Sequence, residues 1–219
     1  MAETGATQVP NTKITSDNTN VFINCPYDED YVASNLRPLV FVILFMDFKP
    51  RLAMEILDSG QTRMQKIIAL ISESKFSIHD LSRLQANKKK EIFRLNMAFE
   101  LGLDMGARIF SGDHKGNKKF LVLEKEKFML KKALSDFDGF DYKSHNNLPE
   151  DIVRAVRDWL AQYRPDNARS VGYIWEKYNL FMSFLYDSKI DGSWGEEDIK
   201  KMQITDFMKL AKNWIEFNR

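Results

Sequence analysis

The sequence predicts an α/β fold: a five-stranded, mainly parallel sheet with helices on both faces, followed by a C-terminal helical extension. Short apolar runs of strand length alternate along the chain with amphipathic stretches of helical period, which is typical of strand–helix–strand units. The 219 residues suffice for one sizeable α/β domain with an extension, and fall short of two full domains. Large aromatic residues gather after residue 165, in stretches that also favour helices.

The chain divides into three expected regions: a loose leader at residues 1–20, an α/β domain at 21–164, and a helical extension at 165–219. The leader is rich in Thr, Asn, Ala and Ser, a composition that cannot bury a core. The extension begins at the break around Pro165 and carries Trp175, Phe181 and Trp214 as packing residues. Such side chains predict docking onto the α/β domain, onto a partner protein, or between copies in a homo-oligomer.

The strands are expected where short runs of apolar and β-branched residues end at turn residues, at 21–25, 51–56, 76–80, 120–124 and 139–142. The helices between and after them are expected at 63–72, 92–106, 149–163 and 170–216. The stretch from Tyr31 to Phe48 is ambiguous, because its middle is β-branched and aromatic while its apolar residues follow helical spacing. We interpret it as a buried helix.

Composition and charge exclude several classes of function. The net charge of +1 provides no field that would favour nucleic acid or an anionic membrane, and we interpret the basic run at 87–90 as a solvated segment. The single Cys25 excludes an intrachain disulfide and a cysteine-based zinc cluster, and the three histidines lack the spacing of metal ligands. We therefore expect no metal site and no nucleic-acid partner.

The sequence also lacks the signals of export and membrane insertion. Residues 1–20 are polar, without the apolar core of a signal peptide. The longest apolar run, at 39–46, is far below the roughly 18 residues needed to span a bilayer. We expect a cytoplasmic protein with no membrane partner.

Polar segments follow the strands, at the edge where parallel sheets bind their ligands. Segments 26–30, 55–60 and 80–83 are expected to meet along one rim. Asn24 and Asp28 offer hydrogen bonds to a base or a ribose, although a turn role is the favoured interpretation of both.

Two further pairs of residues are suited either to a ligand or to the fold. Asp80 and Ser82 can bind ribose, and can equally cap a helix. Arg51 and Arg83 can bind phosphate with two hydrogen bonds each, and can equally form surface salt bridges, for Arg51 with the acidic residues at 55 and 58.

The helix expected after the third strand carries the candidate catalytic group. Asn96, Glu100 and Asp104 are spaced four residues apart and so lie on one stripe, while Leu95 and Phe99 on the opposite face are expected to pack against the sheet. A glutamate near the start of such a helix can face the rim. From spacing alone, a solvated or salt-bridged glutamate is the favoured interpretation.

Two reactive residue types have simpler interpretations. Cys25 lies in an apolar strand and is interpreted as a core thiol, and His79 as a histidine that makes a structural hydrogen bond. No Gly-x-Gly-x-x-Gly segment or Walker loop occurs, so redox-cofactor and nucleoside-triphosphatase functions have no motif support.

The strand, acidic turn, segment Ile78–Arg83 and helix with Glu-Leu-Gly together resemble TIR-type NAD-cleaving domains and nucleoside deoxyribosyltransferases. In both groups a helix glutamate faces the ribose of the substrate. The resemblance implies a flavodoxin-like strand order of 2-1-3-4-5 and assigns the catalytic role to Glu100.

The chain also resembles a family of bacterial proteins described only as nucleotide-binding. The resemblance is carried by segments 22–28, 78–83, 96–103, 134–136, 156–159, 174–178 and 206–214. Together with the residue chemistry above, it gives the expected nucleotide-binding set: Asn24, Tyr27, Asp28, Arg51, Asp80, Ser82, Arg83 and Asn96.

These resemblances imply cleavage or transfer at the N-glycosidic bond of NAD or a related nucleotide, by a hydrolase or a glycosyl transferase, in bacterial defence signalling. NAD or the nucleotide would be the substrate, and no separate cofactor is expected. Such a bond breaks through an oxocarbenium-like state, which a carboxylate beside the ribose stabilises. The alternative is a non-catalytic module that senses a nucleotide or scaffolds an assembly.

Overall fold

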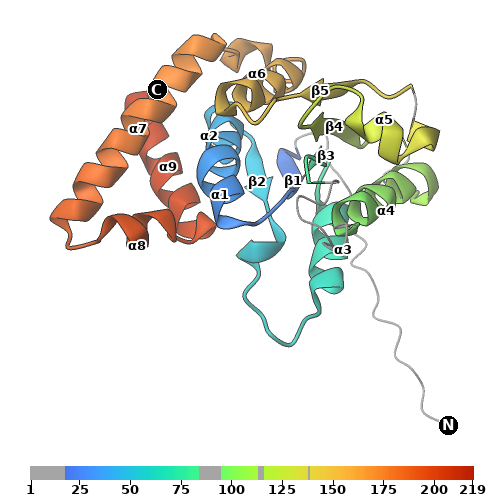
Figure 1. Ribbon diagram of the computed structural model, residues 1–219, viewed down its shortest axis with the longest axis horizontal. Coiled ribbons are helices and arrows are strands. Elements are labelled where there is room, and N and C mark those ends of the chain that lie inside the picture. The colour runs from blue at the N-terminus through green and yellow to red at the C-terminus, as the bar shows by residue number, and fades with distance from the viewer. Residues whose placement is uncertain (1–17, 84–94, 113–115, 138) are drawn as a thin grey trace.

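The structure is a computed structural model that describes residues 18–83, 95–112, 116–137 and 139–219. Its centre is a five-stranded parallel sheet with the strand order β2-β1-β3-β4-β5 (Figure 1). The strands are β1 Asn20–Asn24, β2 Lys49–Arg51, β3 Phe76–Asp80, β4 Lys119–Glu124 and β5 Tyr142–Ser144. The expected α/β class and the flavodoxin-like strand order are therefore confirmed.

Helices cover both faces of the sheet (Figure 1). Those within the α/β part are α1 Glu29–Tyr31, α2 Arg37–Phe45, α3 Arg63–Glu73, α4 Asn96–Phe110, α5 Met129–Ala133 and α6 Pro149–Leu160. Ile23 and Ile78 of the two central strands share one hydrophobic cluster with α2 and α6. Phe22 points to the other face, where it packs with side chains of α3 and α4.

The stretch after Tyr31 is helical, as expected. A π-helical turn, Val32–Leu36, leads into α2, and every residue of α2 except Leu44 is buried. A helix that is apolar all round is typical of a position covered on every side. The absence of a polar face explains why the sequence pattern was ambiguous between strand and helix.

The second strand was predicted wrongly at 51–56. β2 is shorter and earlier, and the chain then forms a 3₁₀ turn, Ala53–Glu55. The Glu55 carboxylate accepts a hydrogen bond from the Leu52 backbone N–H at 3.1 Å, so this N–H serves the turn and not a sheet ladder. Pro50 stands inside β2, a position that is tolerated because β2 is an edge strand paired only with β1.

The other expected elements lie close to their predicted places. β3 matches its prediction, β4 begins one residue earlier than expected, and β5 follows the predicted 139–142 with only Tyr142 in common. The start predicted for the helix at 92–106, the basic run at 87–90 and His114 lie outside the described residues.

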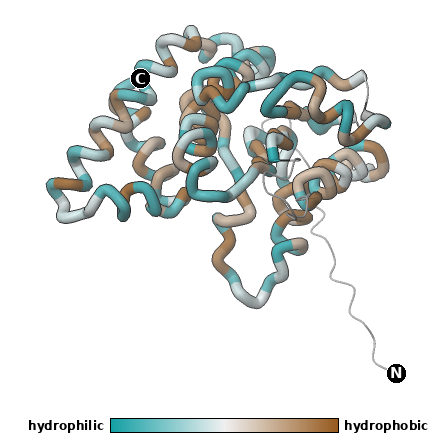
Figure 2. The backbone as a smooth tube through the Cα atoms, in the orientation of Figure 1, coloured by the Kyte–Doolittle hydropathy of each residue, from teal (hydrophilic) through white to brown (hydrophobic). Residues whose placement is uncertain are grey.

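The expected helical extension is confirmed as α7 Val171–Asp191, α8 Glu196–Lys200 and α9 Ile204–Asn218. It packs onto the outer side of α2. Phe181 is fully buried, with its ring 5.6 Å from that of Phe41, and Trp214 lies 6.3 Å from Phe41. Figure 2 shows hydrophobic residues concentrated where α2 lies between the sheet and these helices.

Arg37 joins the start of α2 to the extension. Its buried guanidinium donates hydrogen bonds to the carbonyls of Ile199 and Lys200, at 2.6 and 3.0 Å, and lies over the ring of Phe207. The extension and the sheet therefore share one hydrophobic core. In the described part of the chain, no helix combines the length and apolar character needed to cross a bilayer.

Candidate functional site

The candidate site lies where β1 and β3 end. Because the strands are parallel, the ends of neighbouring strands meet at one edge, where ligands of open α/β sheets bind. The Asn24 amide donates a hydrogen bond of 2.8 Å to the carbonyl of Met97, and this contact brings the first turn of α4 against the end of β1. Glu100 follows on the same helix, so it also lies near this edge.

Asp80 ends β3 and is fully buried. Its Oδ2 accepts a hydrogen bond from the Tyr31 hydroxyl and lies 3.2 Å from His145 Nε2, while Oδ1 accepts the Ser82 backbone N–H at 2.9 Å. Burial disfavours the charged form of Asp80, but the interaction with His145, with help from Tyr31 and Ser82, outweighs burial and lowers the pKa of Asp80. Asp80 is thus a fixed, buried carboxylate.

The hydrogen bonds of His145 define its tautomer. Nδ1 accepts the backbone N–H of Asn147 at 3.1 Å, so the ring proton is on Nε2, which faces Asp80. The backbone N–H of His145 in turn bonds to the carbonyl of Glu124 at the end of β4. Asp80 is therefore held from β3, α1 and the segment after β5 at once.

A second buried chain of polar side chains begins at Asn24. Its Nδ2 lies 3.1 Å from His79 Nδ1, and His79 Nε2 lies 3.0 Å from Asp104 Oδ2. Asp104 Oδ1 is 2.9 Å from the Nζ of Lys118, which also donates to the carbonyls of Ile71 and Ser74, both at 2.6 Å. We call Asn24, His79, Asp104 and Lys118 the buried network; all four side chains are buried.

The buried network is structural. It joins β1, β3, α4 and the end of α3, and its polar groups have partners inside the protein. Burial opposes the charge on Asp104, but His79 and Lys118 outweigh burial and lower the pKa of the carboxyl group. Burial lowers the pKa of Lys118, which its partner Asp104 opposes. The structural interpretation of His79 fits this arrangement, and Asn24 has no free amide hydrogen directed at a ligand by these contacts.

Glu100 is buried, with 5% of its surface exposed, yet its carboxylate has no hydrogen bond or ion pair with any described residue. Burial raises its pKa, and the charge of Arg63 only partly opposes this shift. Burial also raises the pKa of the Cys25 thiol, and the charges of Asp80 and Glu100 raise it further. Cys25 is therefore a poor nucleophile, and Glu100 is a chemically available carboxyl group at this edge.

Tyr27 and Arg63 lie beside Glu100. Burial is the main cause that raises the pKa of Tyr27, and the charge of Glu100 contributes to it. The Arg63 guanidinium lies 5.3 Å from the centre of the Tyr27 ring. Arg63 was not among the expected site residues.

Asp28 and Arg83 bind each other at the rim. Arg83 Nη2 lies 2.8 Å from Asp28 Oδ1, and both side chains are about one-third exposed. The same Asp28 oxygen accepts the Tyr31 backbone N–H at 3.1 Å and so caps α1. The turn role favoured for Asp28 is therefore present, and Arg83 is the expected phosphate ligand that reaches the rim. The Ser82 hydroxyl is buried without a hydrogen-bond partner in the described part of the chain.

Two further expected binding residues have surroundings unlike those of Glu100. Arg51 is held by Glu55 at 2.5 Å and by Glu73, the last residue of α3, at 3.0 Å, so its guanidinium serves salt bridges. Asn96 is exposed at the start of α4.

The orientation of α4 differs from the prediction. Leu95 and Phe99 were expected against the sheet, but they are 65% and 55% exposed, while Glu100 and Asp104 face inward. The inward polar stripe is stable because His79 and Lys118 compensate the charge of Asp104. His79 and Lys118 are 25 and 14 residues away from Asp104 in the chain (104 − 79 and 118 − 104). A local sequence pattern therefore cannot reveal them as its partners.

The fold and this edge together define an α/β protein with a flavodoxin-like sheet and, at the carboxyl ends of its central strands, a buried carboxyl group that no described residue pairs with. Compared with protein-family models, curated proteins and solved structures, the chain has no significant match. Among the residues that the structure describes, no group of three or more His, Cys, Asp or Glu side chains is placed to hold a metal ion.

Proposed function

We propose that this protein cleaves or transfers at the N-glycosidic bond of NAD or a related nucleotide, with Glu100 as the catalytic residue. The observation that supports the proposal is the state of Glu100: a buried carboxyl group that has no partner among the described residues, at the edge where parallel sheets bind ligands. The resemblance to NAD-cleaving TIR-type domains and nucleoside deoxyribosyltransferases supports the same reaction. The same resemblance is our reason for proposing a role in bacterial defence signalling.

Cleavage of the N-glycosidic bond requires little from the protein beyond such a carboxylate. The C1′–N bond breaks and its electron pair leaves with the base, so positive charge develops on the ribose. An ionised Glu100 stabilises this charge, and its low-dielectric surroundings strengthen the interaction. Water or another acceptor then adds to C1′ and gives up a proton. Because burial raises the pKa of Glu100, turnover should increase as the pH rises through that pKa.

The neighbouring groups suit the rest of a nucleotide. Arg83, which contacts Asp28, and Arg63, which lies over the Tyr27 ring, supply positive charge for a phosphate. Ser82 and Asp28 offer oxygen atoms to a ribose. Asp80 acts through position, because its own oxygens are already bonded to Tyr31, Ser82 and His145.

The deciding experiment is incubation of the purified protein with NAD and with nucleosides, followed by chromatography of the products. The matched variants are Glu100→Gln and Glu126→Gln, since Glu126 is an exposed glutamate paired only with a surface lysine. We expect Glu100→Gln to lower turnover about a hundredfold or more, the usual loss of one electrostatic stabiliser. Glu126→Gln should leave it unchanged. Equal turnover by the parent and Glu100→Gln would refute the catalytic role.

A nucleotide-sensing or scaffold module is the second candidate. It is favoured by the number of polar groups at this edge that are already bonded internally, above all Asn24 and Asp80. A sensor would be stabilised against heat by NAD and release no product, and Glu100→Gln would change only the affinity. Product formation by the parent protein excludes this candidate.

A further inference from the structure

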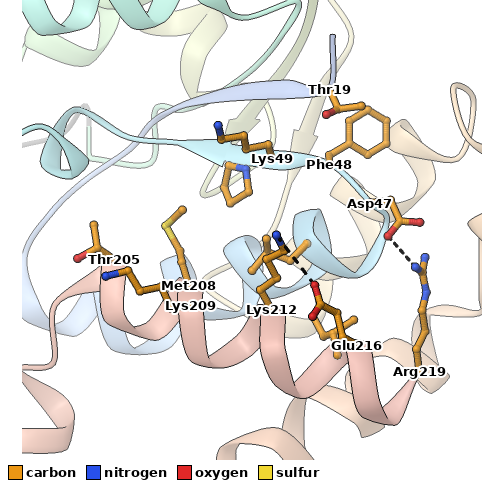
Figure 3. A pocket seen from close by; sticks show the side chains of 13 residues that line it. Thr19, Asp47, Phe48, Lys49, Thr205, Met208, Lys209, Lys212, Glu216 and Arg219 are labelled. Atoms are coloured by element: carbon orange, nitrogen blue, oxygen red, sulfur yellow. Dashed lines mark hydrogen bonds and ion pairs between the residues drawn. The ribbon is translucent and has the colours of Figure 1, made fainter. Parts of the chain in front are cut away.

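A groove of about 720 Å³ lies between the edge strand β2 and helix α9 (Figure 3). It is at the amino edge of the sheet, because Thr19 directly precedes β1 and Lys49 begins β2. Glu100 is near the opposite, carboxyl edge. The groove is therefore separate from the proposed nucleotide site, and its volume is within the range of about 300–1,000 Å³ that is typical of small-molecule sites.

The floor of the groove is apolar and its border is cationic. Leu44, Phe48, Pro50, Met208 and Ile215 form the apolar part. Figure 3 shows Lys49 on the strand side and Lys209 and Lys212 on the helix side, with Met208 between them.

Cations exceed anions at this border. Arg219 is committed to Asp47, at 2.6 Å, and to the carbonyl of Phe45. Lys212 and Glu216 are 4.0 Å apart and exposed, which makes a weak pair. Lys49 has no ion pair with any described residue. Lys49 is therefore available to an anion, and Lys212 can exchange its weak pair with Glu216 for one.

The edge of β2 is unsuited to an added peptide strand. The Lys49 backbone N–H bonds to the carbonyl of Thr19 and so points to β1. The next residue, Pro50, is the one whose backbone faces away from β1, and proline has no N–H to donate. A small molecule with an apolar body and one negative group fits the groove better than a peptide chain.

We propose that this groove binds a free fatty acid, with the alkyl chain on the apolar floor and the carboxylate at Lys49 and Lys212. Lysine and carboxylate form charge-assisted hydrogen bonds, and each CH₂ group that is buried on the apolar floor should add to the affinity. The inference does not depend on the nucleotide activity.

Calorimetric titration of the full chain with octanoate, decanoate and dodecanoate, each below its micelle concentration, tests the proposal. The Kd should fall about threefold to fourfold for each CH₂ group that is buried. Dodecanol, which has the same chain and no charge, should bind at least about tenfold more weakly. Failure of dodecanoate to bind, or equal binding of dodecanol, would overturn the proposal.

Matched variants locate the site. The double substitution Lys49→Met with Lys212→Met should weaken dodecanoate binding at least about tenfold. The control removes two exposed lysines at the far side of the sheet, Lys127→Met with Lys143→Met, and should bind as the parent does. A groove variant that binds like this control would show that the fatty acid binds elsewhere or without site selectivity, and would overturn the proposal. All four positions are exposed, so the variants should fold.

Discussion

Glu100 and Asp104 are two buried carboxyl groups one turn apart on the same helix, and their surroundings are opposite. Asp104 has His79 on one oxygen and Lys118 on the other, and its pKa is lowered. Glu100 has no partner among the described residues, and its pKa is raised. A protein keeps a buried charge cheaply only by pairing it, so the paired group belongs to the fold and the unpaired one is a candidate for function.

Of the substitutions that test this comparison, Lys118→Met should lower the free energy of unfolding the most. It leaves the Asp104 carboxylate buried without its cation, and breaking a buried pair in this way costs about 3–5 kcal/mol of unfolding free energy. Chemical denaturation followed by circular dichroism measures it. Lys200→Met, which removes an exposed lysine, is the control. A loss below about 1 kcal/mol would mean that the buried network contributes little to stability.

His145→Phe should have the next largest effect, because it removes a partner from the buried Asp80. We expect a loss of about 1–3 kcal/mol, since one acceptor site becomes unsatisfied. The pKa of Asp80 is lowered in the folded state, so its contribution to stability is present above the unfolded pKa and disappears as the pH falls through the folded pKa. The variant should therefore unfold at a higher pH during acid titration than the parent does. Unchanged acid unfolding would contradict the assigned contact.

Arg63→Met should change the pH profile more than the fold. The charge of Arg63 opposes the effect of burial on Glu100, so its removal should raise the pKa of Glu100 further. The rising limb of turnover should move to higher pH, with the plateau at high pH less affected. The Arg154→Met variant, which alters an exposed arginine on α6, should keep the parent profile. An unchanged pH profile would show that the charge of Arg63 does not affect the pKa of Glu100.

Glu100→Gln should have the smallest effect on stability, and its sign is informative. The pKa of Glu100 is raised in the folded state, so the charged group costs stability above that pKa, and the cost disappears as the pH falls. The variant should be slightly more stable than the parent at pH 8 and equal to it at low pH. Thermal unfolding at both values checks this. A destabilised variant at pH 8 would reveal a partner for the carboxylate.

The alternation of apolar runs predicted most of the fold. It located β1, β3 and β4 closely, because buried parallel strands are continuous apolar runs. β2 was placed too late, since a three-residue edge strand containing Pro50 has no strand pattern to detect. Buried α2 was ambiguous for the related reason that it lacks a polar face.

The candidate residues were predicted to meet at one edge of the sheet, but their contacts were not predicted. Glu100, Tyr27 and Asp80 do lie near the ends of β1 and β3. The partners of Asp80, however, are Tyr31 and His145. They are 49 and 65 (145 − 80) residues away from it in the chain. Only the folded structure brings such residues together, and no local pattern marks them.

The position of α2 has a consequence for how the chain is made. α2 is synthesised early, but its outer side is covered by α7 and α9, which are synthesised more than one hundred residues later, since 171 − 45 is 126. Until α9 leaves the ribosome, an apolar helix has no cover on that side. The hydrogen bonds of Arg37 likewise form only after Ile199 and Lys200 have been synthesised. During translation this apolar surface of α2 therefore stays exposed, and open to wrong contacts, until α7 and α9 have been synthesised.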